Sequence, residues 1–213
     1  VNDIAPSISY GSTSLTLTNG TAMTTETVTS TGGAVVSYSV SPSLPAGLSL
    51  DTSTGAISGT PTAVTSSASY TITATNTGGT DTASMTIVVN DVVPSNLAYS
   101  PNSFTLTKGT QMTTVTPTAN GGTIVSYSVS PSLPAGLSLD TSTGAISGTP
   151  TAVTSSASYT ITATNTGGSD TASVTIVVND VIPSDLDYSP NSFTLTKGTQ
   201  MTTVTPTANG GTI

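Results

Sequence analysis

The chain has 213 residues, with two Lys, no Arg, ten acidic residues and a formal net charge of −8, and it contains no Cys, His or Trp. Nucleic-acid binding is excluded, because it needs clustered cations that neutralise phosphates. Without His or Cys the chain builds neither a Ser-His-Asp triad nor the common metal sites, so we expect no enzymatic activity and no cofactor.

Short strands with turns between them are predicted along the first ninety residues, with no helical period. Apolar and polar residues alternate in the segments 15–18, 23–28, 36–40, 48–50, 56–58, 70–75 and 82–89. About seven short strands in a unit of this length are typical of an Ig-like β-sandwich. No apolar run approaches the roughly 20 residues that cross a bilayer, so we expect no membrane insertion within this segment.

The stretch Leu44–Pro61 carries the clearest local signal, a β-hairpin around the loop 51–55. We expect Pro45 to preset φ for a type I turn that Gly47 closes at its last position. Asp51 is expected to accept hydrogen bonds from backbone N–H groups a few residues on. Gly55 is expected to adopt a positive φ, which costs glycine nothing because it has no Cβ.

A small apolar core is expected inside each sandwich, since no Trp or disulfide anchors the two sheets. Outward strand positions are almost all Ser or Thr. Threonine is β-branched and therefore favours strands without adding apolar surface. The predicted core side chains of the first unit are Tyr38, Leu48, Leu50, Ile57, Tyr70, Ile72, Met85 and Ile87.

Internal repetition is the strongest signal in the sequence. Val36–Gly79 is identical to Val125–Gly168, and Tyr99–Ile124 is identical to Tyr188–Ile213, at the same offset of 89 residues. The start of the first unit matches only loosely and is one residue shorter. We therefore predict Ig-like repeats at 1–90 and 91–179 and the first strands of a third at 180–213. The sequence is expected to be a window on a longer array, or to receive its missing strands from another chain.

The hairpin stretch, followed by Tyr70–Asn76, resembles the putative-Ig (He-PIG-type, cadherin-like) tandem repeats of large bacterial surface proteins and adhesins. The resemblance implies tandem cadherin-like or Ig-like sandwiches outside the cell or on its surface, in adhesins, stalks or spacers. With almost no linker and a proline at each junction, the repeats are expected to form an extended rod.

Val89-Asn90-Asp91 followed by Pro94 also looks like a cadherin junction, where Asn and Asp help to hold calcium between domains. This resemblance makes Asn90, Asp91, Asn179 and Asp180 weak calcium candidates. Asp3, Asp81 and Asp170 are the other carboxylates that could contribute. The acidic clusters of a cadherin site are missing, and calcium needs six to eight oxygens. A junction hydrogen bond is the preferred role for Asp91 and Asp180.

Three further features have structural interpretations that we prefer. Lys108 and Lys197 are interpreted as solvated lysines, with an isopeptide bond as the alternative. Asn19-Gly20-Thr21 is the one N-glycosylation sequence in the chain. The Ser/Thr strand faces are interpreted as plain solvated surfaces, with O-glycans or ice binding as the alternatives.

The sequence thus predicts a structural spacer, stalk or fibre segment whose partners are neighbouring repeats. The alternatives are an adhesin module that recognises a glycan or protein, with or without calcium at its junctions, and a fibre in which chains complement each other by strand exchange.

Overall fold

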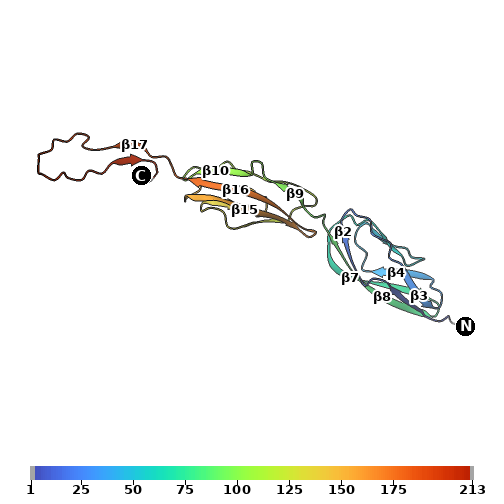
Figure 1. Cartoon of the computed structure of the whole chain (residues 1–213). Helices are drawn as coiled ribbons and strands as arrows, with labels where there is room; N and C mark the ends of the chain where they lie inside the picture. The colour runs from blue at the N-terminus through green and yellow to red at the C-terminus, as the bar shows by residue number, and fades with distance from the viewer. Residues whose placement is uncertain (1–2, 212–213) are drawn as a thin grey trace. The chain divides into compact units, whose positions relative to one another are not determined.

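The computed structural model describes residues 3–211, and all its regular elements are strands, as predicted (Figure 1). Within these residues no helix is long and apolar enough to cross a membrane. The first repeat contains eight strands: β1 (Pro6–Tyr10), β2 (Ser14–Thr18), β3 (Val28–Gly32), β4 (Ser37–Ser41), β5 (Leu48–Leu50), β6 (Ile57–Gly59), β7 (Thr65–Asn76) and β8 (Gly79–Asn90).

Two layers form the first sandwich. One is a four-stranded sheet in the order β2-β8-β7-β4, in which β2 runs parallel to β8 and the other pairs are antiparallel. The other layer consists of the ribbons β1-β3 and β5-β6, joined by an isolated bridge between Glu26 and Ile57. Because the bridge is one residue pair long, this second layer is less regular than the first.

The second repeat has the same plan. Its four-stranded sheet has the order β10-β16-β15-β12, and Val115 bridges to Ile146 where Glu26 and Ile57 meet in the first repeat. Its strands are β9 (Ser95–Ala98), β10 (Ser103–Thr107), β11 (Thr118–Asn120), β12 (Ser126–Ser130), β13 (Leu137–Leu139), β14 (Ile146–Gly148), β15 (Thr154–Asn165) and β16 (Gly168–Asn179). Beyond them, the described residues form only β17 (Ser184–Asp187) and β18 (Thr207–Asn209).

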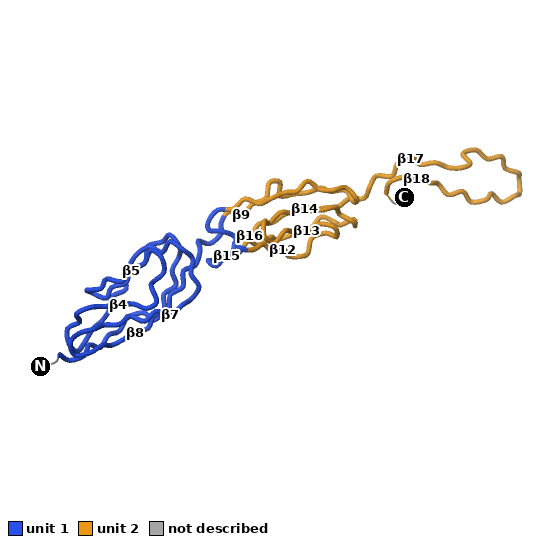
Figure 2. Tube along the Cα trace, turned by 180° about the vertical axis from the view of Figure 1, so that it is seen from behind, with its two compact units in different colours: residues 1–95, 120–125, 164–170 blue, residues 96–119, 126–163, 171–213 orange. Residues whose placement is uncertain are grey.

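The chain divides into two compact units (Figure 2). One comprises the chain up to Ser95 with residues 120–125 and 164–170; the other comprises residues 96–119 and 126–163 and the chain from Thr171 on. The loops 120–125 and 164–170 of the second repeat thus group with the first repeat. The repeat boundaries at 90/91 and 179/180 and the rod arrangement remain predictions.

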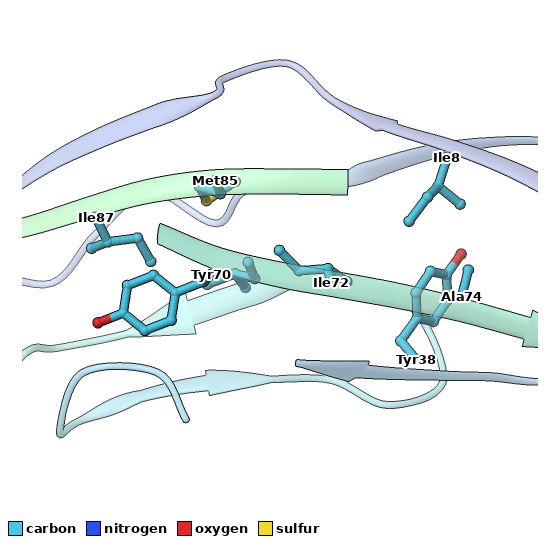
Figure 3. Close-up of a cluster of buried hydrophobic side chains, with 8 residues drawn as sticks. Ile8, Tyr38, Tyr70, Ile72, Ala74, Met85 and Ile87 are labelled. Carbon is cyan, nitrogen blue, oxygen red and sulfur yellow. The ribbon is translucent and has the colours of Figure 1, made fainter. Parts of the chain in front are cut away.

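The core of the first repeat is built from alternate residues of β7 and β8, together with side chains of β1, β4 and β6 (Figure 3). Six of the eight predicted core residues are buried, whereas Leu48 and Leu50 are half-buried at its margin. Figure 3 shows Ile8 pointing from β1 toward Ala74 and Tyr38. Ile8 is 8% exposed and is not among the predicted core residues.

Three strand predictions need correction. β1 was not predicted, and the strand expected at 23–28 is instead β3, at Val28–Gly32. The long strands β7 and β8 extend to twelve residues each, beyond the predicted 70–75 and 82–89.

The extra residue of the later repeats lies in their first strand. Pro6 and Tyr10 correspond to Pro94 and Tyr99, so the segment 94–99, which contains β9, has one residue more than the segment 6–10. Asn96 there has a φ of 55°, and Asp185 in β17 has a φ of 54°. Asn and Asp tolerate the left-handed region better than most residues do. In β17 the pairing register shifts between Ser184 and Asp187, which identifies the insertion as a bulge.

The Pro45 turn differs from the predicted type. The Leu48 N–H donates to the Pro45 carbonyl at 3.0 Å, and Gly47 has a φ of +87° at the third position of the turn. A positive φ at that position is typical of a type II turn rather than type I. A Cβ on Gly47 would lie 2.0 Å from the Thr60 carbonyl oxygen, so this position requires glycine for space as well as for conformation.

Replacing Ile72 tests the alternation on β7. Ile72 is fully buried, so Ile72→Ala should lower the free energy of unfolding of the first repeat by about 2–5 kcal/mol. Thr73→Ala, one residue on and half-buried on the outward face, should cost less than about 1 kcal/mol. Thermal and urea unfolding measure both variants. Equal losses would contradict the inward and outward assignment.

Candidate functional site

The two hairpin loops hold their aspartates by backbone hydrogen bonds, as predicted. Asp51 Oδ1 accepts from the N–H groups of Ser53 at 2.8 Å and Thr54 at 3.0 Å. Asp140 does the same in the second repeat. These bonds favour the ionised form and therefore lower the pKa of both carboxyls. The bond from Thr54 has a larger effect than the bond from Ser53, and the bond from Thr143 has a larger effect than the bond from Ser142. The exposed carboxylates shape the loop, and each lies in a separate hairpin.

A tyrosine at the end of the first strand of each repeat, or directly after it, bonds to the hairpin. The Tyr10 hydroxyl donates to the Gly55 carbonyl at 2.6 Å, and the Tyr99 hydroxyl donates to Gly144 at 2.6 Å. Burial, with smaller contributions from Tyr38 and Glu26, raises the pKa of Tyr10 to about 12. Burial also raises the pKa of Tyr99, with a smaller contribution from Tyr127. Both hydroxyls therefore stay protonated and keep donating across the physiological range.

Asp91 organises the segment that follows β8. Its Oδ1 accepts the Val92 N–H at 2.8 Å and its Oδ2 accepts the Thr123 N–H at 2.9 Å. Its own N–H donates to Thr166 Oγ1 at 2.9 Å. At the corresponding positions Asp3 accepts from Ile4 and Asp180 accepts from Val181, both at 2.9 Å.

A buried asparagine closes the same corner of each repeat. Asn76 is 7% exposed; its Nδ2 donates to the Ile4 carbonyl at 2.7 Å, and its Oδ1 accepts from Gly78 and Gly79. Asn165 makes the matching bonds to Val92, Gly167 and Gly168. A carboxylate has no N–H to donate, so the amide explains why Asn rather than Asp occupies this position.

The calcium candidates lie among hydrogen-bond donors. Both oxygens of Asp91 face backbone N–H groups, whereas a calcium site gathers oxygen ligands around the ion. Asn90 and Asn179 end β8 and β16, and their carbonyls accept from the backbone N–H groups of Asn19 and Lys108. Between residues 3 and 211, no three acidic side chains come together in a group that could hold a metal. These residues fit a hydrogen-bonded junction, and calcium binding remains a prediction.

Two further carboxylates join strands to loops or to the opposite layer. Asp81 lies on the inner side of β8, opposite Ala74, and its Oδ2 accepts the Ile8 N–H of β1 at 2.7 Å. Glu26 Oε1 accepts the Ser12 N–H at 2.8 Å. Neither contact was predicted from the sequence; the partner of Asp81 is 73 residues away.

The outward face of the four-stranded sheet is a hydroxyl surface. Residues opposite one another on β4, β7 and β8 fall into rows that contain only Ser and Thr. These rows are Ser41-Thr71-Ser84, Ser39-Thr73-Thr82 and Ser37-Thr75-Thr80. The middle member of each row is half-buried and its neighbours are exposed, so the face is hydrated but uncharged.

One apolar hollow recurs in both repeats, beside β4 and β5 and beside β12 and β13. In the first repeat it encloses about 340 Å³ between Tyr38, Val40, Leu44, Leu48 and Leu50, with serines on its rim. The identical side chains of the second repeat enclose about 390 Å³. The hollow brings together no acidic or basic side chain, so its chemistry suits apolar or hydroxylated groups.

The remaining candidates from the sequence lie in turns. Lys108 is half-buried in the turn after β10, and Lys197 is exposed after the matching segment 192–196. Asn19 lies in the turn after β2, beside Gly20 with a φ of 76°. Isopeptide formation at the lysines and glycosylation at Asn19 remain hypotheses.

The profile of the family described as "Putative Ig domain" matches the chain twice, over residues 5–90 and 93–179. No curated protein matches the chain by sequence.

Solved structures of tandem Ig domains resemble the chain in fold. The four N-terminal Ig domains of Dscam1 isoform 9.44 share 15% identity at a TM-score of 0.52, covering 84% of this chain and 47% of that one. The eight N-terminal Ig domains of Down Syndrome Cell Adhesion Molecule isoform 1.30.30 share 14% identity at a TM-score of 0.53, covering 88% and 28%. Human Protocadherin-24 EC1-2 shares 15% identity at a TM-score of 0.37, covering 84% and 99%. The chain spans less than half of the two adhesion-molecule structures.

Alkaline unfolding tests the tyrosine contact. Because the folded pKa of Tyr10 is above its ordinary value of about 10, its contribution is complete below pH ~10 and is lost as pH rises toward 12. The double variant Tyr10→Phe, Tyr99→Phe should melt at a lower temperature near neutral pH but lose less stability between pH ~10 and 12. Tyr188→Phe, at an exposed position, serves as control. Parallel melting curves for wild type and double variant across this range would contradict the assignment.

Replacing Asp91 separates its two interpretations. Asp91→Ala removes the acceptor of two backbone N–H groups and should cost about 1–3 kcal/mol of stability. If these bonds are its whole role, calcium and EDTA leave the melting temperature of the wild type unchanged. A rise with calcium that Asp91→Ala abolishes would establish the metal site instead.

Proposed function

The chain belongs to the putative Ig domain family, and from that premise we propose that it is a structural spacer. It would be a segment of the stalk or fibre of a long extracellular prokaryotic repeat protein, exposed at the cell surface. Its partners would be the neighbouring repeats of the same array, and it would carry out no enzymatic reaction.

The observation that carries this proposal is the direct succession of the repeats. β8 ends at Asn90 and β9 begins at Ser95; β16 ends at Asn179 and β17 begins at Ser184. Only residues 91–94 and 180–183 lie between them, and Pro94 and Pro183 restrict these segments further. The uncharged hydroxyl face supports the same role, because it offers a hydrated surface with little chemistry of its own.

Small-angle X-ray scattering of the whole chain tests the proposal. A compact chain of 213 residues has a radius of gyration of about 17 Å. A spacer built from successive repeats should clearly exceed this value. Its maximum dimension should rise by a constant step when a further copy of residues 91–179 is added. A value near 17 Å, or no increase, would contradict the spacer.

An adhesin role is the second candidate, and the recurring hollow beside β4 and β5 favours it. A ligand there would meet Leu48 and Leu50, so Leu48→Asp combined with Leu137→Asp should remove binding to an immobilised glycan or protein. Screening the whole chain against a glycan array, with this variant as control, identifies such a ligand.

Strand complementation between chains is the third candidate, and the exposed apolar residues of 180–211 favour it. Leu186 and Phe193 are 62% and 45% exposed, whereas their counterparts Leu97 and Phe104 are 7% and 9% exposed. A second copy could cover them with its own strands. Light scattering should then show concentration-dependent oligomers that Phe193→Asp abolishes and Val36→Asp, at a 71% exposed site in the first repeat, does not.

A further inference from the structure

The first strand of each four-stranded sheet is paired with the last strand of the repeat. β2 lies beside β8 and runs parallel to it, in a register from Ser14–Thr86 to Thr18–Asn90. β10 lies beside β16 in the same way, from Ser103–Thr175 to Thr107–Asn179. In both repeats the parallel pair therefore joins the incoming chain to the outgoing chain.

This arrangement decides how tension acts on a repeat. The chain enters β2 at its N-terminal end and leaves β8 at its C-terminal end, and in a parallel pair these are opposite ends. Tension enters the first repeat through β1, which pairs with β3. Once β1 is released, pulling slides β2 and β8 along each other and loads all the hydrogen bonds of this pair together. The antiparallel hairpin β7-β8, by contrast, would open one bond after another if its free ends were pulled apart.

We infer that the β2-β8 and β10-β16 pairs are mechanical clamps, which make each repeat a load-bearing module under tension along the chain. The biological use of this property rests on the proposed spacer function. The property itself follows from the topology of a single repeat.

Backbone hydrogen bonds close the clamp at both ends. The Thr86 N–H donates to the Thr13 carbonyl at 2.9 Å, and the Asn19 N–H donates to the Asn90 carbonyl at 2.8 Å. In the second repeat Thr175 donates to Asn102 at 2.8 Å and Lys108 donates to Asn179 at 2.9 Å. The ladder thus extends just beyond the strands in both copies.

The core shields one side of each clamp. Ile87 and Val89 of β8 are fully buried, and in the second repeat Ile176 and Val178 are 0% and 1% exposed. Water can therefore reach the sheared bonds only from the outward face. Past Asn90, the chain is held again at Asp91 by Thr123 and Thr166, so tension passes from β8 into a fixed segment.

The turn after β2 allows a specific test. The Thr21 N–H donates to the Thr18 carbonyl at 3.1 Å and Gly20 has a φ of 76°, which places Asn19 at the second position of a type II turn. Proline favours that position, so Asn19→Pro keeps the turn and removes only the N–H that bonds to Asn90. Asn19→Ala removes the side chain and keeps this N–H. Lys108→Pro and Lys108→Ala form the same pair in the second repeat, where Thr110 donates to Thr107 and Gly109 has a φ of 80°.

Single-molecule force spectroscopy of the whole chain, tethered at both ends, measures the clamp. Each of the two complete repeats should unfold in one step that releases about 250 Å of chain, the extended length of Ser14–Asn90. Forced unfolding reports the unfolding rate. Asn19→Pro should shorten the lifetime of one repeat at constant force about fivefold, the equivalent of one net hydrogen bond. Lys108→Pro should act on the other repeat, and both Ala variants should behave as wild type.

A core variant away from the clamp completes the design. Ile57→Val, at a fully buried position of β6, should lower the melting temperature but leave the lifetime under force nearly unchanged. Unchanged lifetimes for both proline variants, or an Ile57→Val effect as large as that of Asn19→Pro, would overturn the clamp. Scattering reports the arrangement of the repeats and force reports the strength of each one, so the spacer proposal and the clamp can fail separately.

Discussion

The alternation of side chains along β7 from Ala68 on and along β8 is the constraint on which the first sandwich depends, and β15 and β16 repeat it in the second. Ile72 and Ile87 are fully buried, and their neighbours Thr73 and Thr86 lie on the outward face. With charged residues making up 6% of the sequence, the hydroxyls must keep this face hydrated. A shift of one residue in register would exchange the two faces, so the same pattern fixes the core, the strand pairing and the inert surface together.

The alternation is also what made the fold predictable from the sequence. Long strands with one buried face have a clear pattern, and the residues of β7 and β8 were assigned to their correct sides. β1 has a weaker signal, because its alternation of Ile8 and Tyr10 with serines is only five residues long and starts at a proline. The burial of Ile8 also depends on Ala74 and Tyr38 from distant strands. The strand expected at 23–28 failed for a related reason: Glu26 makes only a single bridge to Ile57, and the ribbon begins after it.

Contacts between side chains and distant backbone could not be predicted from the sequence. Asp81 holds Ile8, Tyr10 holds Gly55 and Asn76 holds Ile4, across separations of 73, 45 and 72 residues. Each bond joins a side chain of one strand to a backbone group of a distant segment. These bonds connect β1 and its approach to the rest of the sandwich. Four of the acidic residues considered as metal ligands accept backbone N–H groups: Asp3, Asp81, Asp91 and Asp180.

Glu26 shows how closely such an acceptor depends on its donor. It is the only glutamate in the chain and binds the Ser12 N–H. In the second repeat the corresponding residues are Val115 and Pro101. Proline has no N–H, so the carboxylate has no backbone donor to satisfy at that position and a buried valine, 8% exposed, can replace it. The backbone bridge is present in both repeats, from Glu26 to Ile57 and from Val115 to Ile146. Removing donor and acceptor together leaves no buried group unsatisfied, which explains how the second repeat keeps the same fold without this carboxylate.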